Sequence, residues 1–118
     1  MSLSRPMFEE RTWGNYQVID ISEFSDKFKS LTKKLIILPD KNISYQSHRC
    51  RSEVWVVVDG VGEIVIDGVR KHVHRDDVIT IDVGQKHVLR SITKMTIIEV
   101  QQGENLVEED IERFEYEW

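Results

Sequence analysis

From Leu31 onward, short apolar runs alternate with turn-forming residues. Both Asp-Gly pairs, Asp59-Gly60 and Asp67-Gly68, predict tight hairpin turns, because glycine tolerates positive φ. A turn roughly every eight to ten residues is typical of a β-sandwich or a closed barrel. The runs predict strands at residues 31–38, 43–48, 54–58, 61–66, 69–74, 78–83, 87–92 and 95–101.

The two ends of the chain differ from this pattern. Residues 22–30 are compatible with a short helical turn, and the acidic segment 104–115 predicts a helix that begins near residues 108–111. We therefore expect one domain over residues 1–118, with an N-terminal arm (1–30), a barrel core (31–101) and an acidic C-terminal cap (102–118). Ile111 and Phe114 are the expected anchors of that cap.

Composition supports a β-rich fold and narrows the possible partners. The chain has 14 Val, 13 Ile and no Ala, which favours pleated strands over helices. No apolar run reaches the roughly 20 residues of a membrane helix, so no membrane partner is expected. A formal net charge of -5 without a basic stripe argues against a general nucleic-acid binder, although a small anionic substrate stays possible. The single cysteine, Cys50, fits a reducing cytoplasm.

Four polar residues are candidate metal ligands: Gln46, His48, Glu53 and His87. Gln46 and His48 are two apart on one predicted strand and therefore share a face. Glu53 returns to that face if the polar stretch 49–52 supplies a turn or bulge. Only a fold that wraps back on itself brings His87 to the other three. Two imidazole nitrogens and two oxygens suit Zn, Fe(II), Mn, Co or Ni.

Simpler interpretations of these residues stay open. A lone histidine or glutamine in a strand is most often a polar group satisfied by its neighbours, and the spacing alone does not choose between the two interpretations. A second His-any-His pair, His72 and His74, lacks a glutamate at the following motif spacing, so we predict an outward-facing polar pair. Cys50 is predicted to lie in a turn and to pack as a small hydrophobic residue, although a soft thiolate could also bind a metal.

The two polar segments resemble the two motifs of the cupin family. The stretch 39–60 is similar to the first motif, with Gln46, His48, Glu53 and Gly60 at its key positions. The stretch 76–91 is similar to the second, in which Gly84 and His87 match while Asp76, Asp82 and Ser91 replace the usual Gly, Pro and Asn. This resemblance implies an all-β cupin double-stranded β-helix, a jelly-roll barrel.

Three further segments narrow the resemblance to the cupin domain of type II mannose-6-phosphate isomerases, which is also the C-terminal part of bifunctional mannose-1-phosphate guanylyltransferases. Residues 11–16 (Arg-Thr-Trp-Gly-Asn-Tyr) resemble the family opening Arg-Pro-Trp-Gly-Ser-Tyr. Residues 46–55 resemble the family's Gln-Ser-His-His-His-Arg-Ala-Glu-His-Trp, although Arg49, Cys50 and Val54 replace family histidines. Residues 98–101 and 109–115 resemble its closing segment.

The resemblance implies one divalent transition metal, zinc first, on Gln46, His48, Glu53 and His87, since phosphomannose isomerases generally use Gln, His, Glu and His. It implies isomerisation of mannose 6-phosphate to fructose 6-phosphate, with Lys33 and Arg51, at positions that are basic in the family, as candidates for binding the phosphorylated sugar. Arg90, three residues past His87, is a weaker candidate for the same role. A homodimer is expected from the family and from the need to cover sheet edges. Two alternatives are a non-catalytic sugar- or metal-binding module and another metal-dependent cupin enzyme acting on a small sugar or acid.

Overall fold

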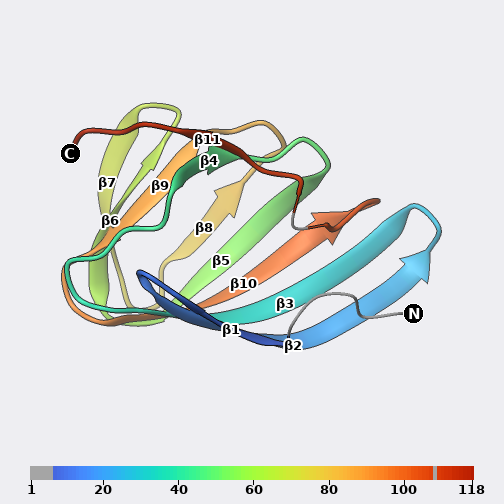
Figure 1. Ribbon diagram of the computed structural model, residues 1–118, viewed down its shortest axis with the longest axis horizontal. Coiled ribbons are helices and arrows are strands. Elements are labelled where there is room, and N and C mark those ends of the chain that lie inside the picture. Colours follow the sequence, from blue (N-terminus) through green and yellow to red (C-terminus); the bar gives the residue numbers. More distant parts are fainter. Residues whose placement is uncertain (1–6, 108) are drawn as a thin grey trace.

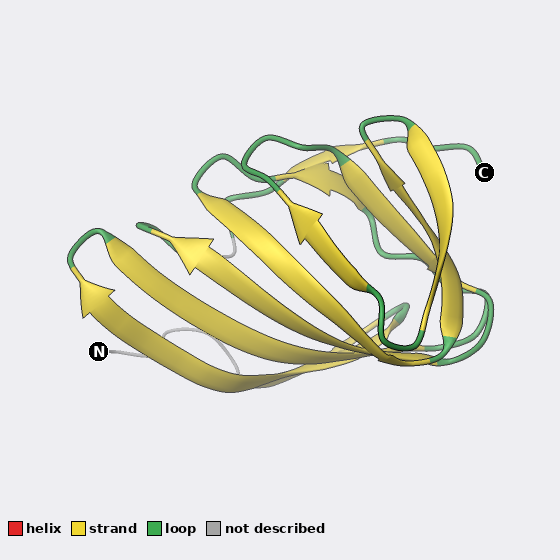
Figure 2. Ribbon diagram, turned by 180° about the vertical axis from the view of Figure 1, so that it is seen from behind, coloured by secondary structure: helices red, strands yellow, loops and turns green. Residues whose placement is uncertain are grey.

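The computed structural model describes residues 7–107 and 109–118, and the regular structure in these residues is entirely β-strand (Figures 1 and 2). The first six residues of the expected N-terminal arm and Glu108 of the expected C-terminal helix lie outside the described residues. The strands are β1 (Phe8–Arg11), β2 (Gly14–Ser25), β3 (Phe28–Ile37), β4 (Tyr45–Ser47), β5 (Arg51–Asp59), β6 (Val61–Ile66), β7 (Val69–His74), β8 (Val78–Ile81), β9 (His87–Ser91), β10 (Met95–Gly103) and β11 (Glu112–Phe114).

The strands form two antiparallel sheets that face each other, which confirms the all-β expectation (Figure 1). The large sheet has the order β1-β2-β3-β10-β5-β8, and the small sheet has the order β11-β4-β9-β6-β7. Successive strands in the sequence repeatedly change sheet, as in a jelly roll.

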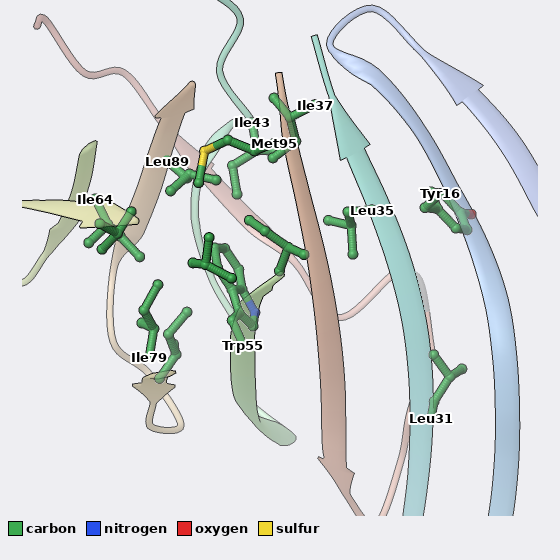
Figure 3. Close-up of a cluster of buried hydrophobic side chains, with 14 of the residues drawn as sticks. Tyr16, Leu31, Leu35, Ile37, Ile43, Trp55, Ile64, Ile79, Leu89 and Met95 are labelled. Atoms are coloured by element: carbon green, nitrogen blue, oxygen red, sulfur yellow. The ribbon is translucent and has the colours of Figure 1, made fainter. Parts of the chain in front are cut away.

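Alternation along the strands builds the core between the two sheets. In β10, Met95 and Ile97 point inward and are fully buried, while Thr96 and Ile98 are half-buried on the other face. Trp55 from β5 and Ile64 from β6 meet them from the two sheets (Figure 3). This apolar packing supplies the main driving force for folding and fixes how the sheets face each other.

The predicted hairpin at Asp67-Gly68 is confirmed, but the one at Asp59-Gly60 is wrong. Asp67 and Gly68 both have positive φ (49° and 80°) and join the paired strands β6 and β7. Strands β5 and β6 do not pair, because the chain crosses from the large to the small sheet at Gly60. Gly60 has φ 95°, and an added Cβ would lie 2.3 Å from the carbonyl oxygen of Lys94. Glycine at this position therefore lets the chain pass close to the Lys94 backbone where it crosses from one sheet to the other.

Neither predicted helical segment is a helix in the described residues. Residues 22–30 belong to the β2–β3 hairpin, where Glu23 and Lys29 face each other as an opposite-charge pair across the strands. Near the C-terminus, β11 pairs with β4, so Arg113 lies opposite Gln46. Tertiary strand pairing decides both segments and overrides their weak local preference. Along the described chain, no helix is long and apolar enough to cross a membrane.

Candidate functional site

Three buried side chains, His48, Glu53 and His87, converge between the two sheets. His48 follows β4 of the small sheet, Glu53 lies on β5 of the large sheet, and His87 is the first residue of β9. Their exposed fractions are 2%, 2% and 0%. One potential ligand atom from each lies within 4.8 Å of the others, so these residues could together hold a metal ion.

Backbone carbonyls set the tautomers of both histidines. The Nδ1 atom of His48 lies 2.7 Å from the carbonyl oxygen of Asp110, and that of His87 lies 3.0 Å from the carbonyl oxygen of Gln85. A carbonyl only accepts, so each Nδ1–H donates and each Nε2 keeps its lone pair. Burial, reinforced by the charge of Arg51, lowers the pKa of His48 to about 4, and burial also lowers the pKa of His87. Both rings are therefore neutral near pH 7, which is the form that binds metals.

The turn expected between His48 and Glu53 is confirmed as a bend at Arg49 and Cys50. Asp110 holds this bend, because its carboxylate accepts from the backbone N–H of Arg49 at 2.8 Å and of Cys50 at 2.9 Å. Together with the His48 contact, Asp110 ties the C-terminal segment to the site. The sequence prediction missed this residue, because acidic segments are usually solvated.

Arg51 places a positive charge between two of the three converging residues. Its Nε donates to Glu53 Oε2 at 2.8 Å, and its Nη2 donates to His48 Nε2 at 3.2 Å. These two acceptor atoms are only 3.3 Å apart, a separation that a shared cation makes favourable. The indole N–H of Trp55 donates to Glu53 Oε1 at 2.9 Å and holds the carboxylate in place.

The donor set fits a divalent transition metal. Among the buried side-chain atoms of the described residues, His87 Nε2 is one of two without a hydrogen-bond partner. A buried acceptor in that state is costly unless a ligand satisfies it. With the neutral His48 Nε2 and the Glu53 carboxylate beside it, the site offers nitrogen and oxygen ligands of the type that zinc and its neighbours accept.

The fourth predicted ligand, Gln46, lies on β4 directly opposite His87. It is half-buried, it lines a cavity next to the cluster, and its Oε1 accepts from the hydroxyl of Ser44 at 3.3 Å. The structure therefore brings Gln46 to the edge of the cluster formed by His48, Glu53 and His87.

Arg51, which hydrogen-bonds Glu53 and His48, connects the cluster to a cavity of about 680 Å³, whose lining does not include His48, Glu53 or His87. Two of the three predicted sugar-binding residues, Lys33 and Arg51, line this cavity. Lys33 is 7% exposed, and its amino group lies 4.1 Å from the centre of the Tyr16 ring. Arg90 is elsewhere: it pairs with Glu63 and lies over the ring of Trp118, and it is not among the described residues that line the cavity.

Two buried polar residues of the cavity were not singled out from the sequence: Glu99 and Gln101 on β10. They occupy the same inward phase as Met95 and Ile97, so the alternation in residues 95–101 carried a signal for them. The large sheet thus presents an apolar half and a polar half to the interior, and the polar half faces the cavity.

The remaining candidates lie away from the cluster. Cys50 is exposed in the bend, so it does not pack as a buried hydrophobic residue. His72 and His74 are exposed on β7, as predicted for an outward-facing pair.

Sequence comparison places this chain beside sugar-phosphate enzymes. The family described as "Mannose-6-phosphate isomerase C-terminal" matches residues 5–116. The chain is 37% identical over 106 residues to a mannose-1-phosphate guanylyltransferase of Salmonella montevideo, covering 88% of this chain. The match covers 21% of that relative, so the chain spans about a fifth of its length.

Structural comparison supports the cupin fold. The capsular polysaccharide assembling protein CapF of Staphylococcus aureus superposes with a TM-score of 0.76 at 18% identity, covering 96% of this chain and 35% of CapF. A conserved protein with a double-stranded β-helix domain from Klebsiella pneumoniae superposes with a TM-score of 0.69 at 17% identity, covering 85% of this chain and 83% of that one. The expected cupin double-stranded β-helix is therefore confirmed.

Proposed function

This chain belongs to the family of mannose-6-phosphate isomerase C-terminal domains, and on that basis we propose that it is a metal-dependent isomerase converting mannose 6-phosphate to fructose 6-phosphate. The observation that carries the proposal is the convergence of His48, Glu53 and His87 beside a cavity that also contains buried cationic side chains. An aldose–ketose isomerase needs electrophilic assistance at the sugar oxygens and a place for the phosphate, and the site has candidates for both.

The metal would be held by His48, Glu53 and His87, with Gln46 at the edge of the set, and zinc is the first candidate ahead of Mn, Fe, Co and Ni. When bound, such an ion stabilises negative charge that develops on the C1 and C2 oxygens of the open-chain sugar. The chain's own contribution is to fix the ligands, through the Asp110 and Gln85 carbonyls on the two imidazoles and through the Trp55 indole on the carboxylate.

Lys33 and Arg51 are the proposed partners of the anionic sugar. Both are at least nine-tenths buried, so their charges act in a medium where Coulomb interactions are stronger than in bulk water. Arg51 offers a planar guanidinium suited to bidentate contact with phosphate, whereas Lys33 offers a point charge. A substrate anion that engages Arg51 would draw its guanidinium away from Glu53 and His48 and so leave these acceptors to the metal.

A second candidate function is a sugar-phosphate-binding module without turnover. The observation that favours it is the bridge made by Arg51, whose guanidinium donates to both Glu53 and His48. In that case, mannose 6-phosphate would bind with similar affinity in the presence and absence of divalent ions, and no product would form.

The test is conversion of mannose 6-phosphate by the full chain after addition of Zn, Mn, Co or Fe(II), followed by nuclear magnetic resonance of the sugar. We expect fructose 6-phosphate with at least one metal, and no product from His87→Gln. His74→Gln is the matched control, because this exposed histidine lies outside the site. Binding of the sugar without product under every metal would contradict the isomerase and favour the binding module.

We also propose that the protein is a cytoplasmic homodimer, as expected from the family and from the need to cover unpaired edge strands. The unpaired cysteine is compatible with a reducing compartment, and β8 and β7 leave edge strands that a second copy could cover. Light scattering coupled to size-exclusion chromatography should give twice the mass of 13.9 kDa, and a mass of one chain would contradict the dimer.

A further inference from the structure

We propose that Glu99 is the acid–base residue of this cavity, which moves the proton between C2 and C1 of the sugar, and that Gln101 positions its carboxyl group and binds a sugar hydroxyl. The proposal rests on the proposed isomerase function and deepens it by naming the group that handles the proton. The expected features of such a group are burial, a place in the substrate cavity and a position beside the metal ligands without being one of them.

Strand register places Glu99 next to the candidate metal ligands. On the large sheet, β10 lies between β3 and β5, so Glu99 faces Lys33 on one side and Trp55 on the other. In the adjacent inward row, Gln101 faces Glu53. Directly opposed residues in a sheet have Cβ atoms about 5 Å apart, and diagonal neighbours are about 7–8 Å apart. Glu99 and Glu53 are such diagonal neighbours, close enough to act on adjacent atoms of one bound sugar.

Gln101 offers the cavity a buried hydrogen-bond acceptor that has no partner within the described part of the chain. Its Nε2 donates to Glu99 Oε1 at 2.6 Å, the amide orientation that suits the carboxylate form of Glu99, which only accepts. Its own Oε1 is fully buried, lines the cavity and is the second of the two unpartnered buried side-chain atoms in the described part of the chain. A sugar hydroxyl is the donor that would satisfy this oxygen.

The two carboxyl groups of the site have different surroundings, which suits different roles. Glu53 accepts from Arg51 and Trp55 and is held as a ligand. Glu99 is buried at 6% exposure, and burial, together with the nearby negative charge of Glu53, raises its pKa, against the opposing effect of Lys33 and Arg51. A buried carboxyl group outside the ligand set can take a proton from the sugar and return it.

The proton transfer balances without any further reagent. The Glu99 carboxylate takes the proton from C2; the C2–H electron pair becomes the C1=C2 double bond, and the C1=O π pair moves to O1. The carboxylic acid then returns its proton to C1, where the C1=C2 π pair forms the new C1–H bond. The proton on O2 passes to O1, and the O2–H electron pair becomes the C2=O π bond. The net change is one proton from C2 to C1 and one from O2 to O1, so the aldose becomes a ketose with no oxidant or reductant.

Lys33 and Arg51 are buried cationic side chains that a sugar in this cavity would meet. The Lys33 ammonium lies over the Tyr16 ring, whose quadrupole attracts a cation. Lys33 is therefore assigned to charge recognition, and Glu99 to proton transfer.

The test compares the metal-loaded full chain with Glu99→Gln, which keeps the size of the side chain, and with Glu23→Gln as the matched control on the exposed part of β2. We expect Glu99→Gln to lower kcat on the order of 10²–10⁴-fold, with KM and metal content close to wild type. In D2O, it should also lose deuterium incorporation into the sugar. In Glu99→Ala, added formate should restore part of the turnover, which a purely structural role would not allow.

Three results would overturn the assignment, and they are distinguishable. An active Glu99→Gln enzyme would remove Glu99 from the reaction while leaving the isomerase proposal intact. A wild-type protein without turnover would refute the isomerase and, with it, the role of Glu99. Loss of metal in Glu99→Gln, combined with no formate rescue in Glu99→Ala, would show that the residue only supports the structure.

Discussion

The buried neutral state of His48 makes the stability of the metal-free protein depend on pH. Its side chain is 1% exposed, and its pKa is lowered to about 4, first by burial and then by the charge of Arg51. In the unfolded chain, the pKa of a histidine is about 6.5. We therefore compare the free energies of unfolding of wild type and His48→Gln at pH about 7.5 and about 5.0.

The direction of the pH effect on the free energy of unfolding follows from proton uptake by the unfolded chain. Above pH ~6.5 the imidazole is neutral in both states and adds no pH dependence. Below that value, the unfolded chain binds a proton that the folded site refuses, so the free energy of unfolding falls by about 1.4 kcal/mol per pH unit until the folded pKa is reached. Between pH ~7.5 and ~5.0, His48 alone should therefore remove about 2 kcal/mol of stability. His87, whose pKa is also lowered, adds to the slope in both proteins.

The assay is urea unfolding in the presence of a chelator, followed by circular dichroism at both pH values. The stability difference between wild type and His48→Gln should change by about 2 kcal/mol in favour of the variant as the pH falls. His74→Gln, whose side chain is 68% exposed, should behave as wild type. Equal losses in wild type and His48→Gln would refute the claim that His48 is held neutral in the folded protein.

Three further outcomes are expected. In chemical denaturation, Gly60→Ala should destabilise the fold by more than about 3 kcal/mol, because the new Cβ meets the Lys94 carbonyl oxygen. Gly68→Ala has open space around it and should cost only about 1 kcal/mol. Equal costs for the two variants would contradict the close approach of the chain at Gly60. Trp55→Phe should lose about 1–3 kcal/mol in the same assay, because Glu53 loses a buried donor, and an unchanged midpoint would show that this bond is unimportant. Zinc at about 100 times its dissociation constant should stabilise the wild type by about 2.7 kcal/mol in a thermal shift measurement, and an equal shift in His87→Gln would place the zinc elsewhere.

The strands could be predicted from the sequence because their apolar and turn residues are locally consistent. Residues 69–74 form β7 as expected, and Asp67-Gly68 has the positive φ values that a tight turn needs. The same reasoning failed at Asp59-Gly60, because a dipeptide reports local backbone freedom and not the sheet to which the next strand belongs. It also failed at residues 22–30, which form the β2–β3 hairpin, where pairing of Lys29 with both Glu23 and Gly103 of β10 builds this end of β3 into the large sheet.

Part of the candidate site could be predicted from the sequence, because three of its residues lie in recognisable motifs. His48, Glu53 and His87 lie in motif segments, and the structure brings them together. Arg90 has the right charge and lies close to His87 in sequence, but it points to the side of the small sheet where Glu63 and Trp118 lie. Asp110 escaped prediction because its role comes from a contact between segments far apart in the chain, the hydrogen bonds that its carboxylate accepts from the bend after β4.

We propose that His48, Glu53 and His87 together hold one divalent transition metal. Isothermal titration of the chelator-treated protein with zinc, checked by elemental analysis of the product, tests this most directly. We predict one equivalent of metal in wild type and in His74→Gln, and none in His87→Gln. Failure of the wild type to retain zinc, manganese, cobalt or Fe(II), or full retention by His87→Gln, would contradict it.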